Sequence, residues 1–522
     1  MFDACDEGAS WLDGERDDAR EAFARPAAIP PGRQSVRLSA LLDRARFVAC
    51  DDIIAGGCHD DPSDCRPGDV FVLRMDGPGE GQDLVAMAIA RGVSGIISEQ
   101  MIPTFGTPLC IVPDAAWALG RLAHACAGDP ARRLKLIAIT GTSGKTTAAW
   151  LAASVLSEAG LRVGVLSDLG CLDADATEPV AADLGQPGVL AVWLSRLAES
   201  GCTHAVVEVS SRMLADHVLA GVSCDTVVVT NLAVAHLDCH GTAEAYHTIK
   251  ARILDTLGAD GCLVANVDDG RVRALADRHA AGRAGRVMRV GLQRSAEIGV
   301  DISGIPVERS LFGQMVLVQA DGHVSPLSLA TPVASFVRDA LFAAAVGLRQ
   351  RMPLERVTRG IEAAGSISGR MERLDRGQDA AVFLDNPTSG HSLATSLSSL
   401  RRLTPGRLVV VAEQSLANDL GGRRFGRRAA RWSDETLVVP ASILDEAAEA
   451  SGNSKALVAY ARFDRLMASL GAGDCLLVLG DIRGSEGGPD DSGEPQASLV
   501  ALVDGWLQLA HPPVWAEDRR AA

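Results

Sequence analysis

The segment TGTSGKTT, residues 140–147, has the composition of a loop that binds phosphate groups. Gly141 and Gly144 allow backbone amides to approach phosphate oxygens, and Lys145 supplies a positive charge. The hydroxyl of Thr146, at the start of a predicted helix, suits Mg²⁺. A glycine-rich turn followed by a capping threonine is the alternative. The loop follows the predicted strand LIAIT and precedes the predicted helix TTAAWLAASVLSEAG, and this order favours phosphate binding.

The spacing of the two glycines differs from the general phosphate-loop pattern, in which the first glycine stands five residues before the second. Here they are three residues apart, and Ile139 occupies the usual place of the first glycine. The general pattern is therefore not strictly met.

Three other residues could serve a site that handles charged phosphates. Glu208 closes the apolar segment HAVVE, where a carboxylate either binds a ligand or is simply solvated. His236 could also bind a ligand, and the alternative is a structural role, which is more common for a lone histidine. Lys250 lies in the predicted helix AYHTIKARIL, fourteen residues after His236, and a surface lysine is the alternative there.

The loop TGTSGKTT resembles that of the Mur ligases, in which asparagine commonly stands at the place of Ser143 and the glycine spacing is similarly short. The segments VEVSSRMLADHV, TNLAVAHLDCHGTAEAYHTIKARI and ANVDD follow in the order and spacing of the Mur ligases that attach the third stem-peptide residue. The similarity covers about residues 50–482 and is strongest over 133–270. It includes PGDVFV near the start and GRMERL further on.

This resemblance implies an ATP-dependent carbon–nitrogen ligase. It would add meso-diaminopimelate or lysine to UDP-N-acetylmuramoyl-L-alanyl-D-glutamate through an acyl phosphate, during the peptidoglycan synthesis that supports cell shape and division. The implied cofactors are ATP and Mg²⁺. The implied partners are a UDP-linked muramoyl peptide or a related carboxylate, and an amino acid acceptor.

The resemblance also implies roles for particular residues. Nucleotide binding falls to Arg370, Asp385 and the loop residues Gly141, Thr142, Ser143, Gly144, Lys145, Thr146 and Thr147. The catalytic residues are Lys145, Lys250, His236 and Glu208. The magnesium ligands are Thr146, Glu208, His236 and a carbamylated Lys250, and Ser210 contacts the substrate.

Several recognition motifs of the family are altered. Asp61, Pro62 and Ser63 stand where the family has Asp-Ser-Arg, and Gly185, Gln186 and Pro187 replace Thr-Thr-Pro. Asp216 and Val218 replace a glutamine and an arginine, Val337 and Ala340 replace two asparagines, and Ala235 replaces an aspartate before His236. The motifs at 385–390, near 439–442 and in GDIRGSE also differ. Because these changes spare the phosphate and metal residues, a ligase acting on another carboxylate and a non-catalytic nucleotide-binding paralogue remain alternatives.

The strands and helices predicted around these residues indicate an α/β protein with three domains. We expect a leader at 1–34, an α/β domain resembling a UDP-substrate domain at 35–132, and a central ATP-binding domain at 133–366. The central domain should hold a doubly wound, mainly parallel sheet extended by a β-rich stretch near 286–330, in which the strand-like segments are RVMRVGL, FGQMVLVQA and VSPLSLA. A Rossmann-like domain with parallel strands should occupy 367–522 and include a glycine- and proline-rich loop at 484–496.

Composition narrows the class of protein. The formal net charge of −16 argues against a protein that follows nucleic-acid backbones. Twelve scattered cysteines suggest reduced, mostly buried thiols. No run of about 20 apolar residues predicts a membrane span, and the N-terminal segment does not resemble a secretory signal. We expect a cytoplasmic monomer.

Overall fold

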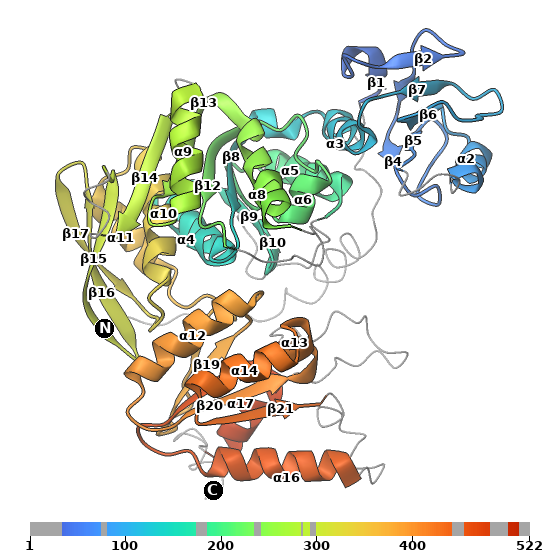
Figure 1. Cartoon of the computed structure of the whole chain (residues 1–522). Coiled ribbons are helices and arrows are strands. Elements are labelled where there is room, and N and C mark those ends of the chain that lie inside the picture. Colours follow the sequence, from blue (N-terminus) through green and yellow to red (C-terminus); the bar gives the residue numbers. More distant parts are fainter. Residues whose placement is uncertain are drawn as a thin grey trace, which may run out of the picture. The chain divides into compact units, whose positions relative to one another are not determined.

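The computed structural model of the chain (Figure 1) describes residues 34–74, 81–173, 185–233, 242–282, 286–292, 299–440, 454–480 and 499–510. His236, nearly all of the predicted leader and the loop predicted at 484–496 lie outside these ranges. The described residues form two compact units. One lies within Met1–Gly141 and Ala159–Met288, and the other within Thr142–Glu158 and Arg289–Ala522.

The first unit opens with a five-stranded sheet in the order β2-β7-β6-β5-β4. Its strands are β2 (Arg46–Val48), β4 (Cys58–His59), β5 (Val70–Val72), β6 (Gly95–Ser98) and β7 (Leu109–Ile111). A two-stranded ribbon, β1 (Val36–Arg37) with β3 (Ile54–Ala55), accompanies it. Strands β4 to β7 are parallel, so their carboxyl ends meet at one edge of the sheet.

Helices cover both faces of this sheet, which explains why the inner strands β5 and β6 are buried along their whole length. Phe71 and Ile96 pack with Val85 of α2 (Gly81–Ala90). Val70 and Ile97 share the opposite core with residues of α3 (Ala115–Cys126).

A ten-stranded sheet has the order β10-β9-β11-β8-β12-β13-β14-β15-β16-β17, and its first six strands belong to the first unit. These six are β8 (Lys135–Thr140), β9 (Val163–Ser167), β10 (Gly170–Leu172), β11 (His204–Glu208), β12 (Cys224–Val229) and β13 (Leu257–Asn266). Strands β9, β11, β8, β12 and β13 run parallel, and β10 is antiparallel to β9. Its helices include α5 (Pro187–Glu199), α6 (Ser211–Ala215), α8 (Ala243–Ala251) and α9 (Gly270–Gly282). The predicted parallel α/β architecture is confirmed.

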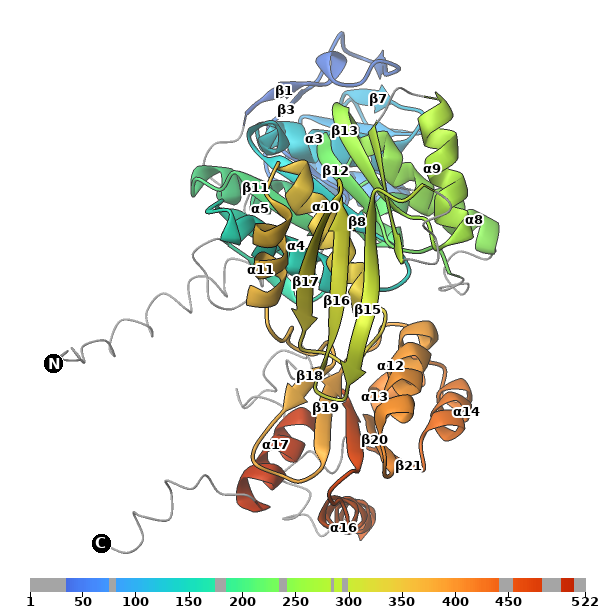
Figure 2. The same cartoon turned by 90° about the vertical axis from the view of Figure 1, so that its left-hand side faces the viewer.

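The second unit contains the helix that follows the phosphate loop, α4 (Lys145–Glu158), packed against α10 (Phe336–Arg349) and α11 (Leu354–Ala363). The strand β14 (Arg286–Leu292) crosses from one unit into the other and pairs with β15 (Ile302–Ser310). Figure 2 shows β15 beside the antiparallel strands β16 (Gly313–Ala320) and β17 (His323–Leu329). The prediction overlooked β15, because Pro306, Glu308 and Arg309 interrupt its apolar pattern.

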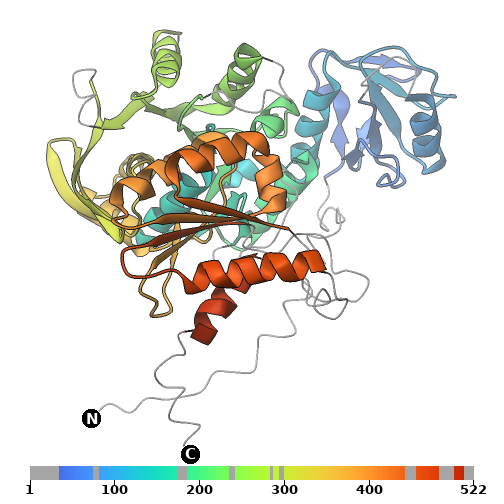
Figure 3. The same cartoon turned by 60° about the horizontal axis from the view of Figure 1, so that its bottom comes forward.

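The last sheet has the order β18-β19-β22-β20-β21. Its strands are β18 (Glu372–Leu374), β19 (Ala381–Asp385), β20 (Leu408–Glu413), β21 (Glu435–Val439) and β22 (Cys475–Leu479). Figure 3 shows it between α12 (Gly390–Leu403), α13 (Gln414–Asp419) and α14 (Arg423–Trp432) on one face and α16 (Ser454–Ala468) and α17 (Leu499–Ala510) on the other. The predicted parallel arrangement holds for four strands, whereas β18 is an antiparallel addition.

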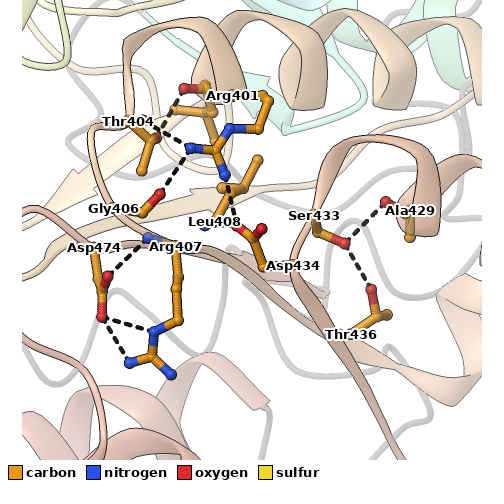
Figure 4. A network of polar contacts seen from close by, with 11 residues as sticks. Arg401, Thr404, Gly406, Arg407, Leu408, Ala429, Ser433, Asp434, Thr436 and Asp474 are labelled. Carbon is orange, nitrogen blue, oxygen red and sulfur yellow. Dashed lines mark hydrogen bonds and ion pairs between the residues drawn. The ribbon is translucent and has the colours of Figure 1, made fainter.

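A polar network fixes the loops of this last sheet (Figure 4). Arg401 donates to Asp434 at 2.6 Å and to the carbonyl oxygens of Thr404 and Gly406. Arg407 donates to Asp474 at 2.7 Å. These contacts join the end of α12 to the strands that follow it.

Each of the three predicted domains contains its own sheet, although the boundaries at 35–132, 133–366 and 367–522 stay predictions. The ten cysteines in the described ranges are free thiols, nine of them buried. Across the same residues, no helix combines the length and apolar character that crossing a membrane requires.

Candidate functional site

The phosphate loop begins where β8 ends, inside the ten-stranded sheet. Thr140 is the last residue of β8, and its carbonyl oxygen accepts a hydrogen bond from the Thr230 amide beyond β12. A Cβ atom added at Gly141 would overlap the Thr230 hydroxyl. Gly141 is therefore required by packing, independently of any ligand.

Lys250 lies beneath this start of the loop. Its side chain comes from α8 and is only 2% exposed. Nζ donates to the Gly141 carbonyl oxygen at 2.8 Å and to the Thr140 hydroxyl at 3.3 Å, and it stands 5.1 Å from the centre of the Tyr246 ring. The surface-lysine alternative is wrong, because this buried cation contacts the phosphate loop.

Glu208 ends β11, the strand directly beside β8, and pairs in register with Ile139. It is 1% exposed, so the alternative of a solvated strand end is also wrong. Its Oε2 accepts a hydrogen bond from the Asp168 amide at 3.1 Å. A buried carboxylate thus lies at the carboxyl edge of the parallel strands, where α/β sheets bind ligands.

The rest of the loop, Thr142 to Thr147, leads into α4 in the second unit. Gly144 has φ of +81°, a conformation that favours glycine, and a Cβ atom there would overlap Oδ1 of Asp339. Asp339 comes from α10 and is buried, and this burial raises the pKa of its carboxyl well above the usual value.

Asp339 was not identified from the sequence. A signal was present, because Asp339 lies three residues after Phe336 and four before Ala343, on the apolar face of its helix. An acidic residue at such a position is unusual and indicates a special environment.

Arg370 contacts Thr146, and Asp385 interacts electrostatically with Arg370. Arg370 donates to the Thr146 hydroxyl at 3.1 Å and to the Asn386 carbonyl oxygen at 2.6 Å. Asp385, at the end of β19, accepts from the Met371 amide at 3.3 Å and from the Ser396 hydroxyl at 2.8 Å. Burial raises the pKa of Asp385, against the opposing effects of Ser396 and Arg370. The structure thus brings three predicted nucleotide-binding residues into one contact network.

Ser210 serves locally as the N-cap of α6, where its hydroxyl accepts from the Met213 amide at 3.1 Å. Asp61 and Ser63, at the place of the family's Asp-Ser-Arg motif, hydrogen-bond to each other, and this contact lowers the pKa of Asp61. The substrate-binding role of Ser210 stays a prediction.

Oxygen donors of the kind that Mg²⁺ prefers are present in Thr146 and Glu208. Among the described residues, no group of three or more His, Cys, Asp or Glu side chains is arranged to hold a metal ion. His236, a predicted ligand, lies outside those residues. The metal assignment therefore stays a prediction.

Comparison with known proteins confirms the resemblance. Residues 139–347 match the Mur ligase middle domain. A UDP-N-acetylmuramoyl-L-alanyl-D-glutamate--2,6-diaminopimelate ligase from Gloeobacter violaceus is 30% identical over 475 residues, which cover 85% of this chain and 93% of the relative.

Solved structures agree on the fold. A structure of UDP-N-acetylmuramoyl-L-alanyl-D-glutamate--2,6-diaminopimelate ligase superposes with a TM-score of 0.66 at 18% identity, covering 92% of this chain and all of that one. The MurF ligase from Thermotoga maritima, solved in complex with ADP, gives a TM-score of 0.54 at 17% identity, with coverage of 81% and 93%.

Proposed function

Because the chain belongs to the Mur ligase family, we propose that it is an ATP-dependent amide ligase that adds an amino acid to a UDP-N-acetylmuramoyl-L-alanyl-D-glutamate substrate. The amino acid is of the diaminopimelate or lysine type. The observation that carries this proposal is the phosphate loop at 140–147, with Lys250 beneath it and Glu208 on the adjacent strand.

The proposed reaction has two steps, the activation of a carboxylate and the formation of an amide bond. A substrate carboxylate oxygen attacks the terminal phosphorus of ATP, forming an acyl phosphate and releasing ADP. The acceptor amine then attacks the acyl carbon, so that an amide bond forms, phosphate leaves and the amine loses a proton. Both steps concentrate negative charge at the phosphates, and preorganised cations and amides stabilise that charge.

The residues around the loop suit these steps. Lys145 supplies a cation at the N-terminus of α4, where backbone amides also attract anions. Arg370 adds a second cation beside Thr146. When bound, Mg²⁺ would neutralise phosphate charge, and Thr146, Glu208, His236 and a carbamylated Lys250 are its proposed ligands.

Carbamylation of Lys250 has a direct test, since CO₂ converts its ammonium into an anionic carbamate. Protein equilibrated with ¹³C-bicarbonate should show a carbamate carbon resonance that Lys250→Gln lacks. Identical spectra for the two proteins would contradict this modification.

We also propose that the protein acts in the cytoplasm as a monomer, because its substrate class and ATP are available there. Mass photometry at working concentration should then show one species near the sequence mass of 54.5 kDa.

The altered recognition motifs keep two alternatives open: a ligase acting on another carboxylate, and a nucleotide-binding paralogue without catalysis. The deciding experiment incubates purified protein with ATP, Mg²⁺, the UDP-muramoyl dipeptide and a panel of amino acids, and it measures phosphate release and product mass. We expect a coupled product with a diaminopimelate-type or lysine-type acceptor. ATP binding without any product would instead favour the non-catalytic alternative.

A further inference from the structure

Arg74 stands at the edge of the first sheet where a ligand is expected. It lies two residues after the end of β5, and Asp60 directly follows the neighbouring strand β4. The two strands are parallel, so both residues lie at the carboxyl edge of the sheet. Ligands of open α/β sheets bind outside this edge.

Two carboxylates from different parts of the first unit hold the Arg74 guanidinium. Nη2 donates to Asp216 at 2.6 Å, and Nη1 donates to Asp60 at 3.2 Å. Burial alone would lower the pKa of Arg74, but Asp216 and Asp60 together raise it above its usual value. The side chain is therefore a fixed cation with a defined orientation.

This cation still has capacity to bind a ligand. Its side chain is 38% exposed. A guanidinium has five N–H donors, and only two hydrogen bonds from Arg74 occur within the described part of the chain. A carboxylate or phosphate can occupy the remaining donors in the two-pronged geometry that arginine favours.

The residues after Asp216 fix the turn that carries this carboxylate. Val218 is fully buried. Its carbonyl oxygen accepts a hydrogen bond from Nε2 of His124 at 2.9 Å. Asp216 therefore stands beside a turn that is anchored in the core, and it holds the Arg74 guanidinium from that fixed position.

We propose that Arg74 binds an anionic group of the carboxylate substrate, a phosphate or a carboxylate, and that Asp216 positions the guanidinium. This inference rests on the proposed function and names a specificity-determining residue for it.

Calorimetry on the 522-residue chain tests this proposal by measuring the affinity for three ligands. They are UDP, the complete substrate UDP-N-acetylmuramoyl-L-alanyl-D-glutamate, and the muramoyl dipeptide that lacks UDP. Arg74→Ala should weaken binding of the complete substrate at least about 20-fold, while affinity for a non-hydrolysable ATP analogue changes less than about twofold. Arg74→Lys should recover part of the loss, and Asp216→Asn should weaken binding about three- to tenfold. Loss confined to UDP-containing ligands identifies a phosphate as the bound group, whereas equal loss without UDP identifies a carboxylate.

Arg212→Ala is the matched control. Arg212 also pairs with Asp216, at 3.6 Å, but its side chain is 83% exposed and lies on α6. This variant should bind every ligand as the unmodified protein does.

The outcomes separate the two proposals. If the unmodified protein binds the complete substrate and Arg74→Ala binds it equally well, the role of Arg74 is refuted and the proposed function stands. Parallel loss of substrate and ATP-analogue binding would show that Arg74 is a structural tie, which also refutes the inference. If the unmodified protein binds none of the three ligands, the proposed function fails, and the inference fails with it.

Discussion

The phosphate loop and the carboxyl edge of the first sheet differ in how tightly the fold determines their residues. At the loop, Gly141 and Gly144 are confined by Thr230 and Asp339, and Lys250 is buried against the loop backbone. At the first edge, Asp60 and Arg74 are partly exposed and held by ion pairs. Packing against buried neighbours therefore fixes the backbone at the phosphate loop, whereas ion pairs between partly exposed side chains hold the residues of the first edge.

Lys145→Ala should have the largest effect of the substitutions, and it tests the role of the phosphate loop in ATP binding. Removing the cation from the phosphate loop should abolish measurable ATP binding and lower ligase turnover by at least about 1,000-fold. Calorimetry with an ATP analogue and a phosphate-release assay measure the two losses. Arg402→Ala, which alters an exposed arginine of α12, is the control and should change neither. Unchanged ATP affinity in Lys145→Ala would exclude this loop as the nucleotide site.

Gly144→Ala tests whether packing fixes the loop. The added methyl group meets Asp339 and the backbone must hold a positive φ, so we expect about 2–4 kcal/mol of destabilisation and weaker ATP binding. Denaturant unfolding gives the first quantity. Adding Asp339→Ala should recover part of the stability, because it removes the overlapping carboxylate. Strictly additive effects of the two substitutions would show that the two residues do not interact.

The pH dependence of the stability tests the region beside the first sheet. His124 lies in α3 and donates to the carbonyl oxygen of Val218. Burial lowers the pKa of His124 from 6.5 to about 4, against the opposing effect of its hydrogen bond to Val218. Because the folded pKa lies below the unfolded value, the unfolded state binds the proton more readily. The stabilisation is therefore complete above pH 6.5 and is lost as pH falls toward 4, by up to about 3 kcal/mol.

Urea unfolding of the unmodified protein and of His124→Gln over this pH range measures that loss. The variant should lack the part of the slope that belongs to His124. Parallel curves for the two proteins would mean that His124 titrates alike in the folded and unfolded states.

Gly120→Ala should give the smallest effect. Gly120 lies in α3, and a methyl group there would overlap the backbone carbonyl of His217, which cannot move without shifting the turn. We expect about 1–3 kcal/mol of destabilisation. Gly188→Ala is the matched control in α5, where nothing lies near the added atom, and it should stabilise by about 0.5–1 kcal/mol. Equal thermal midpoints for the two variants would contradict a close contact at Gly120.

The sequence predicted much of this arrangement because the relevant signals are local. The strand before the phosphate loop, the helix after it and the acidic end of β11 follow from apolar runs and their boundaries. Strand β15 was missed because half of it is polar, and the antiparallel pairing of β18 depends on strand order, which no local pattern specifies.

Only part of the site was predicted, because several of its contacts join residues that are distant in the chain. Lys250 and Glu208 were identified, but their burial was not predicted, since it depends on neighbours distant in the chain. Arg74 and Asp216 are 142 positions apart, and nothing in either local sequence indicates that they meet. Asp339 had a local signal in its helix and could have been found.

The most direct test of the account is a crystal structure with a non-hydrolysable ATP analogue and Mg²⁺. We predict that the triphosphate lies against the backbone of residues 141–147, with Lys145 contacting its oxygens and Mg²⁺ bound by Thr146 and Glu208. A nucleotide bound elsewhere, or a triphosphate making no contact with this loop, would contradict the proposed function.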